Sequence, residues 1–135
     1  MFSGAFKSAR KLASKEDGSS TIEAVIWFPI FVGFFLMVAD VALIFHGQAQ
    51  MLRIAQDANR LYSVGRLPDE AATAAYVVNR LAQMGKPATA ETVLSGDDVI
   101  TTTVHVRTGD IDAVGVIEML TDIELTITSQ HVKEV

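Results

Sequence analysis

The hydrophobic positions along the chain follow three patterns, one after another. Residues 24–45 form an almost unbroken apolar run in which Asp40 is the one charged residue. Residues 46–66 then repeat apolar positions at steps of three and four, which is typical of one face of a helix. Beyond residue 100, apolar and polar positions alternate one by one, which is typical of strands. The pattern therefore predicts a long helix first and a small sheet last.

The apolar run is long enough to cross a lipid bilayer. At about 1.5 Å per residue, a helix over residues 24–45 spans roughly 33 Å. A buried core helix is the alternative, but a chain of 135 residues has too little other apolar surface to surround it. Pro29 lies near the start of the run, where its missing N–H costs little. We therefore expect residues 19–45 to form a transmembrane helix.

The second half of this helix, residues 46–66, is expected to be amphipathic and to end near residue 64, with Gly65 as its C-cap. Its apolar stripe consists of Met51, Ile54, Ala55, Ala58, Leu61 and Tyr62. Polar residues fill the positions between them. Such a stripe must be covered by the protein's own small domain or by other helices in a bundle.

Residues 67–135 are expected to form a small extracytoplasmic α+β domain. The turn residues 68–70 open a second helix that runs to about Met84. Two antiparallel strands follow, over 100–107 and 123–128, with a short helix or an irregular crossover between them. Because the domain lacks Phe and Trp, its core should be marginal alone. We predict that the first helix, or a partner, completes it, so that the fold class is α+β.

Charge is divided unevenly along the chain. The first 18 residues carry four basic and two acidic side chains, whereas the remainder carries seven basic and fourteen acidic ones, for a total of −5. Basic flanks of membrane helices stay in the cytoplasm. We therefore expect residues 1–18 to be a basic cytoplasmic leader and the C-terminal domain to lie on the opposite side of the inner membrane. The acidic balance also argues against a nucleic-acid partner.

Little in the sequence points to catalysis. The chain has no cysteine, and its histidines, His46, His105 and His131, do not stand at a metal-binding spacing. Nucleotide-binding loops and hydrolase motifs are missing from the sequence. We therefore predict that the protein is not an enzyme, and that it has no catalytic residue, no metal site and no cofactor.

Asp40 is the one charged residue inside the apolar run. A carboxylate inside a membrane helix is costly and usually faces a polar partner or water. Asp40 lies close to the outer end of the run, so two interpretations stay open. It reaches the membrane interface, or it makes a polar contact within the membrane.

The residues Gly18-Ser19-Ser20-Thr21-Ile22-Glu23 stand at the threshold of the apolar run. A glycine, four uncharged residues and a glutamate, between a basic leader and an apolar helix, resemble a type IV prepilin processing site. The resemblance implies that a membrane-embedded prepilin peptidase cuts between Gly18 and Ser19. A carboxylate at the edge of hydrocarbon needs a cationic partner, and the new amine of Ser19 on a neighbouring subunit supplies one for Glu23, setting the register between helices. The same residues also fit a capped helix start.

The resemblance extends over about residues 17–66. A glutamate that opens the run and a Phe28-Pro29 step shortly after it are similar to the TadE/TadF-like (pseudo)pilins of tight-adherence (Tad/Flp) pilus systems. Ala24 stands where the very short major Flp pilins carry a tyrosine, and a sizeable C-terminal region follows. These departures favour a minor pilin or pseudopilin over the bulk filament subunit. The family implies a type IV pilin-like fold, with other pilin-like subunits and pilus-assembly membrane proteins as partners.

Together these features predict a minor pilin or pseudopilin that takes part in Tad-type pilus assembly after cleavage and supports surface adhesion. Its C-terminal domain would be periplasmic, or would lie on the extracellular pilus if the subunit enters the filament. An uncleaved single-pass scaffold or chaperone of a secretion or pilus machine is the alternative. A periplasmic ligand-binding domain released by an ordinary signal peptidase would begin near residues 45–50, and the continuous helical pattern there argues against it.

Overall fold

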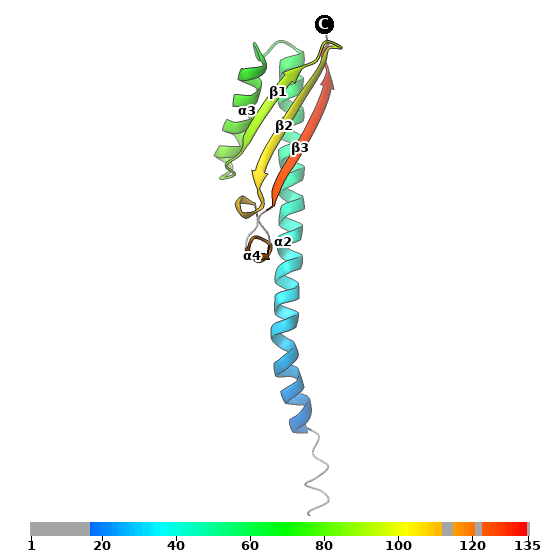
Figure 1. The fold of residues 1–135 in the computed structure, drawn as a ribbon, viewed down its shortest axis with the longest axis vertical. Coiled ribbons are helices and arrows are strands. Elements are labelled where there is room, and N and C mark those ends of the chain that lie inside the picture. The colour runs from blue at the N-terminus through cyan, green and yellow to red at the C-terminus, as the bar shows by residue number, and fades with distance from the viewer. Residues whose placement is uncertain (1–16, 112–114, 121–122, 135) are drawn as a thin grey trace, which may run out of the picture. The chain divides into compact units, whose positions relative to one another are not determined.

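The computed structural model of the chain describes residues 17–111, 115–120 and 123–134. Its elements, in chain order, are α2 (Asp17–Ser63), α3 (Glu70–Gln83), β1 (Thr89–Leu94), β2 (Val99–Arg107), the 3-10 turn η1 (Thr108–Asp110), α4 (Val116–Leu120) and β3 (Glu124–Val132) (Figure 1). The fold is α+β, as the sequence predicts. The chain divides into two compact units, an N-terminal unit (Met1–Leu36) and a C-terminal unit (Met37–Val135).

The described part of the N-terminal unit is a helical segment whose apolar side chains are uncovered. Val25, Phe28 and Phe35 are 67%, 68% and 65% exposed. Among the described residues, α2 is the one helix long and apolar enough to cross a membrane, with a mean hydropathy of 2.4 over its most apolar window. The core helix of a soluble protein would bury such side chains. Their exposure fits a helix that is anchored in a membrane.

The ends of both long helices are set by local capping. Gly65 adopts a left-handed φ of +74° after α2, and the N–H of Arg66 donates to the carbonyl of Leu61 at 2.8 Å. Gly85 ends α3 in the same way, with a φ of +72°. At the other end of α3, Asp69 Oδ1 accepts a hydrogen bond from the N–H of Ala72 at 2.7 Å. These caps satisfy backbone groups that a helix leaves unpaired, and they confirm the predicted boundaries.

The sheet is antiparallel, with the strands in the order β1-β2-β3. Two of these strands were predicted, although β3 continues to Val132, four residues beyond the predicted end. The prediction of only two strands was wrong, because it omitted β1. The sequence of β1, Thr-Ala-Glu-Thr-Val-Leu, mixes Thr and Val, which favour strands, with Ala and Glu, which do not, and it lacks a regular alternation of apolar and polar positions. Its pairing with β2 and its packing against α3 compensate for that weak local preference.

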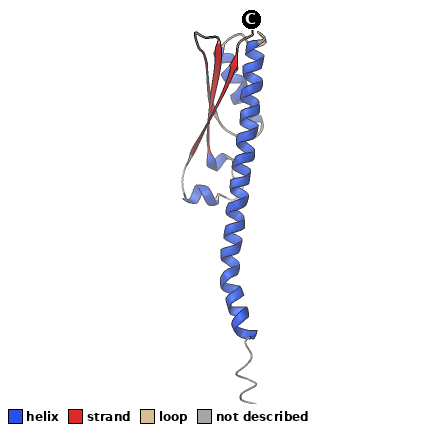
Figure 2. Ribbon diagram, turned by 90° about the vertical axis from the view of Figure 1, so that its right-hand side faces the viewer, coloured by secondary structure: helices blue, strands red, loops and turns tan. Residues whose placement is uncertain are grey.

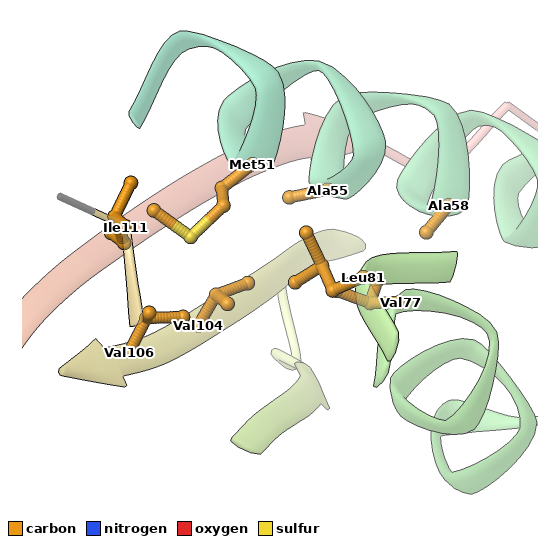
Figure 3. Packing of buried hydrophobic residues seen from close by; sticks show 8 residues of the cluster. All are labelled: Met51, Ala55, Ala58, Val77, Leu81, Val104, Val106 and Ile111. Carbon is orange, nitrogen blue, oxygen red and sulfur yellow. The ribbon is translucent and has the colours of Figure 1, made fainter. Parts of the chain in front are cut away.

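The core lies between the C-terminal half of α2, α3 and one face of the sheet, and Figure 2 shows the sheet to one side of α2. Its buried members are Met51, Ala55, Ala58, Val77, Leu81, Val104, Val106 and Ile111 (Figure 3). Three of these residues belong to α2, so the first helix completes the core, as expected for a domain that lacks Phe and Trp. The small alanine side chains let the helix backbone approach α3 and β2 closely.

A buried polar network fixes α2 against the sheet. Asn59 is fully buried. Its Nδ2 donates to the Ser129 carbonyl at 3.0 Å, and its Oδ1 accepts from Thr102 Oγ1 at 2.5 Å. The hydroxyls of Thr102 and Thr92 lie 2.8 Å apart, which extends the network to β1. Because these bonds join α2 to all three strands, they specify one register of the helix on the sheet.

Replacing Asn59 with alanine is expected to lower the free energy of unfolding by about 2–3 kcal/mol, because the Ser129 carbonyl loses its buried donor and a small void remains. Urea unfolding of the full chain in mild detergent, followed by circular dichroism, measures the change. Gln56→Ala is the matched control, since Gln56 is exposed on the same helix, and its effect should stay within about 0.5 kcal/mol. Equal effects of the two substitutions would contradict a structural role for the network.

Candidate functional site

The predicted processing motif forms the first turns of α2. The helix begins at Asp17, so Gly18 and Ser19 have helical backbones. A protease takes its substrate in extended form, and this turn must therefore unwind before the Gly18–Ser19 bond enters a catalytic cleft. Unwinding is easy here, because the N–H groups of a first turn have no intrahelical partners and glycine weakens a helix by about 1 kcal/mol relative to alanine. The preceding leader, residues 1–16, lies outside the described residues.

Glu23 stands in the second turn of α2 with its side chain exposed. Together with Ala24, Trp27 and Phe31 it lines a shallow depression on the helix surface. The rings of Trp27 and Phe31 lie 6.2 Å apart, centroid to centroid. Within residues 17–111, 115–120 and 123–134, no basic side chain forms an ion pair with Glu23. An acidic group beside exposed aromatic rings is suited to a cationic partner from another chain that also covers the rings.

Asp40 is fully buried and has a partner from the C-terminal domain. The N–H of Val116, at the start of α4, donates to Asp40 Oδ2 at 2.8 Å across 76 residues of sequence. Gly115, with a φ of +74°, turns the chain into α4 just before this bond. The carboxylate thus satisfies one of the N–H groups that the first turn of a helix leaves unpaired. The sequence left open whether Asp40 reaches the membrane interface or makes a polar contact, and it did not identify α4 as a partner.

A second contact holds the connection between β2 and β3, residues 108–123, against α2. Gly47 and Ile111 are buried against each other, and a Cβ atom at Gly47 would overlap Ile111 Cγ2. Next to this contact, Lys86 Nζ donates to Gln50 Oε1 at 2.6 Å, and Gln50 Nε2 lies 3.0 Å from His46 Nε2. The β2–β3 connection is therefore attached to α2 at two places, near Asp40 and near Gly47.

The part of the chain that the structure describes holds no group of three or more His, Cys, Asp or Glu side chains that could bind a metal ion. The three histidines lie on separate elements. His105 Nδ1 is 3.3 Å from Glu124 Oε1 at the exposed face of the sheet. A groove of about 600 Å³ is lined by Asp57, Arg60, Leu61, Val64, Arg66 and Tyr76. Its mixed charges and wide opening do not resemble a small-molecule site.

Tyr62 is the residue whose acidity the fold changes most clearly. Burial raises the pKa of its hydroxyl above the ordinary value, and the negative charges of Glu70 and Asp69 raise the pKa further. Lys133 Nζ lies 5.8 Å from the centre of the ring, on the last described turn of the chain. Tyr62 therefore remains protonated at neutral pH and serves the packing of the helix end.

In the comparison with protein families, the family described as TadE-like protein matches residues 18–60. The matched segment begins at Gly18 and contains Glu23, the apolar run and the helix stripe as far as Ala58. Over this segment the chain is similar to TadE-like proteins, and the match confirms the resemblance seen in the sequence. No curated protein and no solved structure matches the chain.

Gly47→Ala is expected to destabilise the C-terminal unit by about 1–3 kcal/mol, because the new methyl group overlaps the branched Ile111 side chain, which has little freedom to move. Urea unfolding in detergent measures the change. Gly33→Ala, in the same helix, is the control, since a Cβ atom there meets nothing within 4 Å. Adding Ile111→Ala to Gly47→Ala should recover part of the loss, and a strictly additive double variant would contradict the contact.

Proposed function

We propose that this protein is a minor pilin or pseudopilin that takes part in Tad-type pilus assembly after a prepilin peptidase removes residues 1–18, and that it thereby supports surface adhesion. The coincidence of the TadE-like match with an uncovered apolar helix carries the proposal. The match begins at Gly18, and the helix that follows exposes its large apolar side chains. Such a surface needs lipid before assembly and other helices after it.

The physical role of cleavage in this proposal is to make a new charge at the correct end of the helix. Removal of the leader frees the amine of Ser19, and Glu23 lies one turn further along α2. In an assembled bundle, the Glu23 carboxylate accepts hydrogen bonds from the Ser19 amine of a neighbouring subunit. Away from water, a charged group without its partner costs free energy, so the two opposite charges hold the helices in the position where they meet. The pair therefore sets the axial register of the helices.

The proposed partners follow from this arrangement. The prepilin peptidase acts on the Gly18–Ser19 bond, and other pilin-like subunits and pilus-assembly membrane proteins contact the apolar face of α2. The basic leader favours an N-terminus on the cytoplasmic side of the inner membrane and a periplasmic C-terminal domain. Assembly then exchanges lipid contacts for helix contacts as the subunit leaves the bilayer.

A second candidate is an uncleaved membrane scaffold or chaperone of a secretion or pilus machine. One observation favours it: Gly18 and Ser19 lie within the helix, where a protease reaches the backbone only after local unwinding. In this role the apolar helix stays in the membrane and Glu23 serves as a permanent contact for another membrane protein. The two candidates differ in the mass of the protein in the cell.

The intact mass and N-terminal sequence of the membrane-extracted protein test the proposal, in cells with and without their prepilin peptidase. We expect a chain that begins at Ser19 only when the peptidase is present. Gly18→Val should abolish this cleavage, because a branched side chain at the cut obstructs the close approach of the backbone to the protease cleft. Gly33→Val is the control within the same helix and should be processed normally.

A chain that begins at Met1 in both strains would overturn the cleavage proposal and favour the uncleaved scaffold. Normal processing of Gly18→Val would show that the glycine is not the cleavage determinant. Loss of processing in both Gly18→Val and Gly33→Val would instead show that a valine anywhere in the helix prevents cleavage.

Glu23→Gln should leave processing intact and reduce the amount of the protein that co-purifies with other pilin-like subunits by at least about tenfold. A tenfold change corresponds to about 1.4 kcal/mol, less than the usual cost of removing one partner of a charge pair away from water. Crosslinking in cells followed by mass spectrometry measures the change. Glu91→Gln, exposed on β1, is the matched control. Unchanged co-purification of the Glu23 variant would refute the pairing.

A further inference from the structure

The β2–β3 connection carries apolar side chains that nothing in the described chain covers. Met119 is 86% exposed, Leu120 69% and Ile123 43%. They differ from the outward face of the neighbouring strands, which carries mainly polar residues, among them several threonines. Three uncovered apolar side chains within five residues are costly in water, and a patch of this kind marks a contact surface.

The attachment of α4 to α2 fixes how deep this patch lies along the apolar run. The hydrogen bond from Val116 to Asp40 places the start of α4 beside residue 40. Phe45, at the end of the run, is five residues further along α2, or about 7.5 Å at 1.5 Å per residue. Interfacial helices bury their apolar side chains about 5–10 Å into the boundary between headgroups and acyl chains. The start of α4 lies within that depth range.

The surface of α2 at this level is itself apolar and uncovered. Val41 and Leu43 are each 38% exposed, and Phe45 is 65% exposed. If residues up to Phe45 remain in hydrocarbon, then Val116, which contacts Asp40, lies in the hydrocarbon layer as well. Exposed apolar side chains of α2 and of α4 therefore lie in the same region of the chain, next to the bond between Val116 and Asp40.

We propose that α4 together with Ile123, called here the interfacial foot, inserts the side chains of Met119, Leu120 and Ile123 into the membrane leaflet that faces the C-terminal unit. The occupant of the patch is the boundary between headgroups and acyl chains of that leaflet. The foot rests on the membrane anchoring of α2 that is part of the proposed function, and it requires neither cleavage nor pilus assembly.

The contacts that attach the foot to α2 suit this depth. A carboxylate inside a membrane helix costs about 2.5–3.5 kcal/mol on insertion scales, and Asp40 reaches the interface with its oxygen already bonded to Val116. The buried contact of Gly47 with Ile111 holds the other end of the connection against α2. The hydrogen bond and the packing contact thus hold the foot in a fixed position within the C-terminal unit.

Charge does not drive the insertion of the foot. Residues 108–124 include acidic side chains and no basic ones. Anionic headgroups therefore do not attract the segment, and the apolar area of Met119, Leu120 and Ile123 is the source of affinity. Zwitterionic lipid is accordingly the suitable probe.

Single labels test the depth directly, because the chain has no cysteine of its own. The full chain with one bimane-labelled cysteine is placed in phosphatidylcholine nanodiscs that hold one copy each. Met119→Cys reports the foot, Phe35→Cys reports the span, and Val93→Cys, 51% exposed on β1, is the matched apolar control. All three native side chains are exposed, so the substitutions leave the core intact. Quenching by acyl-chain-brominated lipid is compared with quenching by aqueous iodide.

We expect brominated lipid to quench the Phe35 and Met119 labels at least about threefold more than the Val93 label, as interfacial burial requires. Iodide should show the reverse order. A Met119 label quenched by iodide as strongly as Val93 would overturn the foot. Protection of Met119 from both quenchers would overturn it as well, since a protein surface then covers the patch. A Phe35 label beyond the reach of brominated lipid would refute the membrane anchoring of α2 itself.

Discussion

The packing of Ala55 and Ala58 against the buried face of the sheet and against α3 is the contact on which the other features of the C-terminal unit depend. Without Phe or Trp of its own, the region after residue 67 cannot enclose an adequate core. The C-terminal half of α2 supplies the missing layer, and Asn59 then fixes its register through bonds to Thr102 and Ser129. One helix thus carries two surfaces with opposite needs: an exposed apolar one that fits lipid or other helices, and a covered one that the domain requires.

Local chemistry made much of the fold predictable. Helix spacing, Gly65 and the Asp69 cap are properties of adjacent residues, so α2 and α3 were anticipated to within a few positions. The strand β1 was missed because Ala90 and Glu91 interrupt its strand-forming residues, and because its stability comes from pairing with β2. The bonds of Asn59 and Asp40 were unpredictable for a related reason, since their partners lie 43 to 76 residues away. Such contacts depend on how the helix is positioned on the sheet, and the spacing of residues along the sequence does not predict that position.

In the candidate site, too, the features set by adjacent residues were predictable, whereas those set by long-range contacts were not. Gly18 and Glu23 stood out from the sequence because a motif and its surroundings lie within one short segment, and the TadE-like match covers that segment. The structure adds the helical state of Gly18, the exposed position of Glu23 and its neighbouring rings. The interfacial foot left no motif in the sequence. Its apolar residues are few, and their depth along the apolar run follows only from the bond between α4 and Asp40.

The bonds that close the C-terminal unit also bear on when it folds. Asn59 and Ser63, near the end of α2, are bonded to the carbonyls of Ser129 and Val132 in the last strand. During synthesis, the helix therefore emerges long before the residues that complete its contacts. Contacts of such high sequence separation form late and slowly. The C-terminal unit therefore cannot close until the residues of β3 are available, and a truncation within β3 removes the bonds that close it.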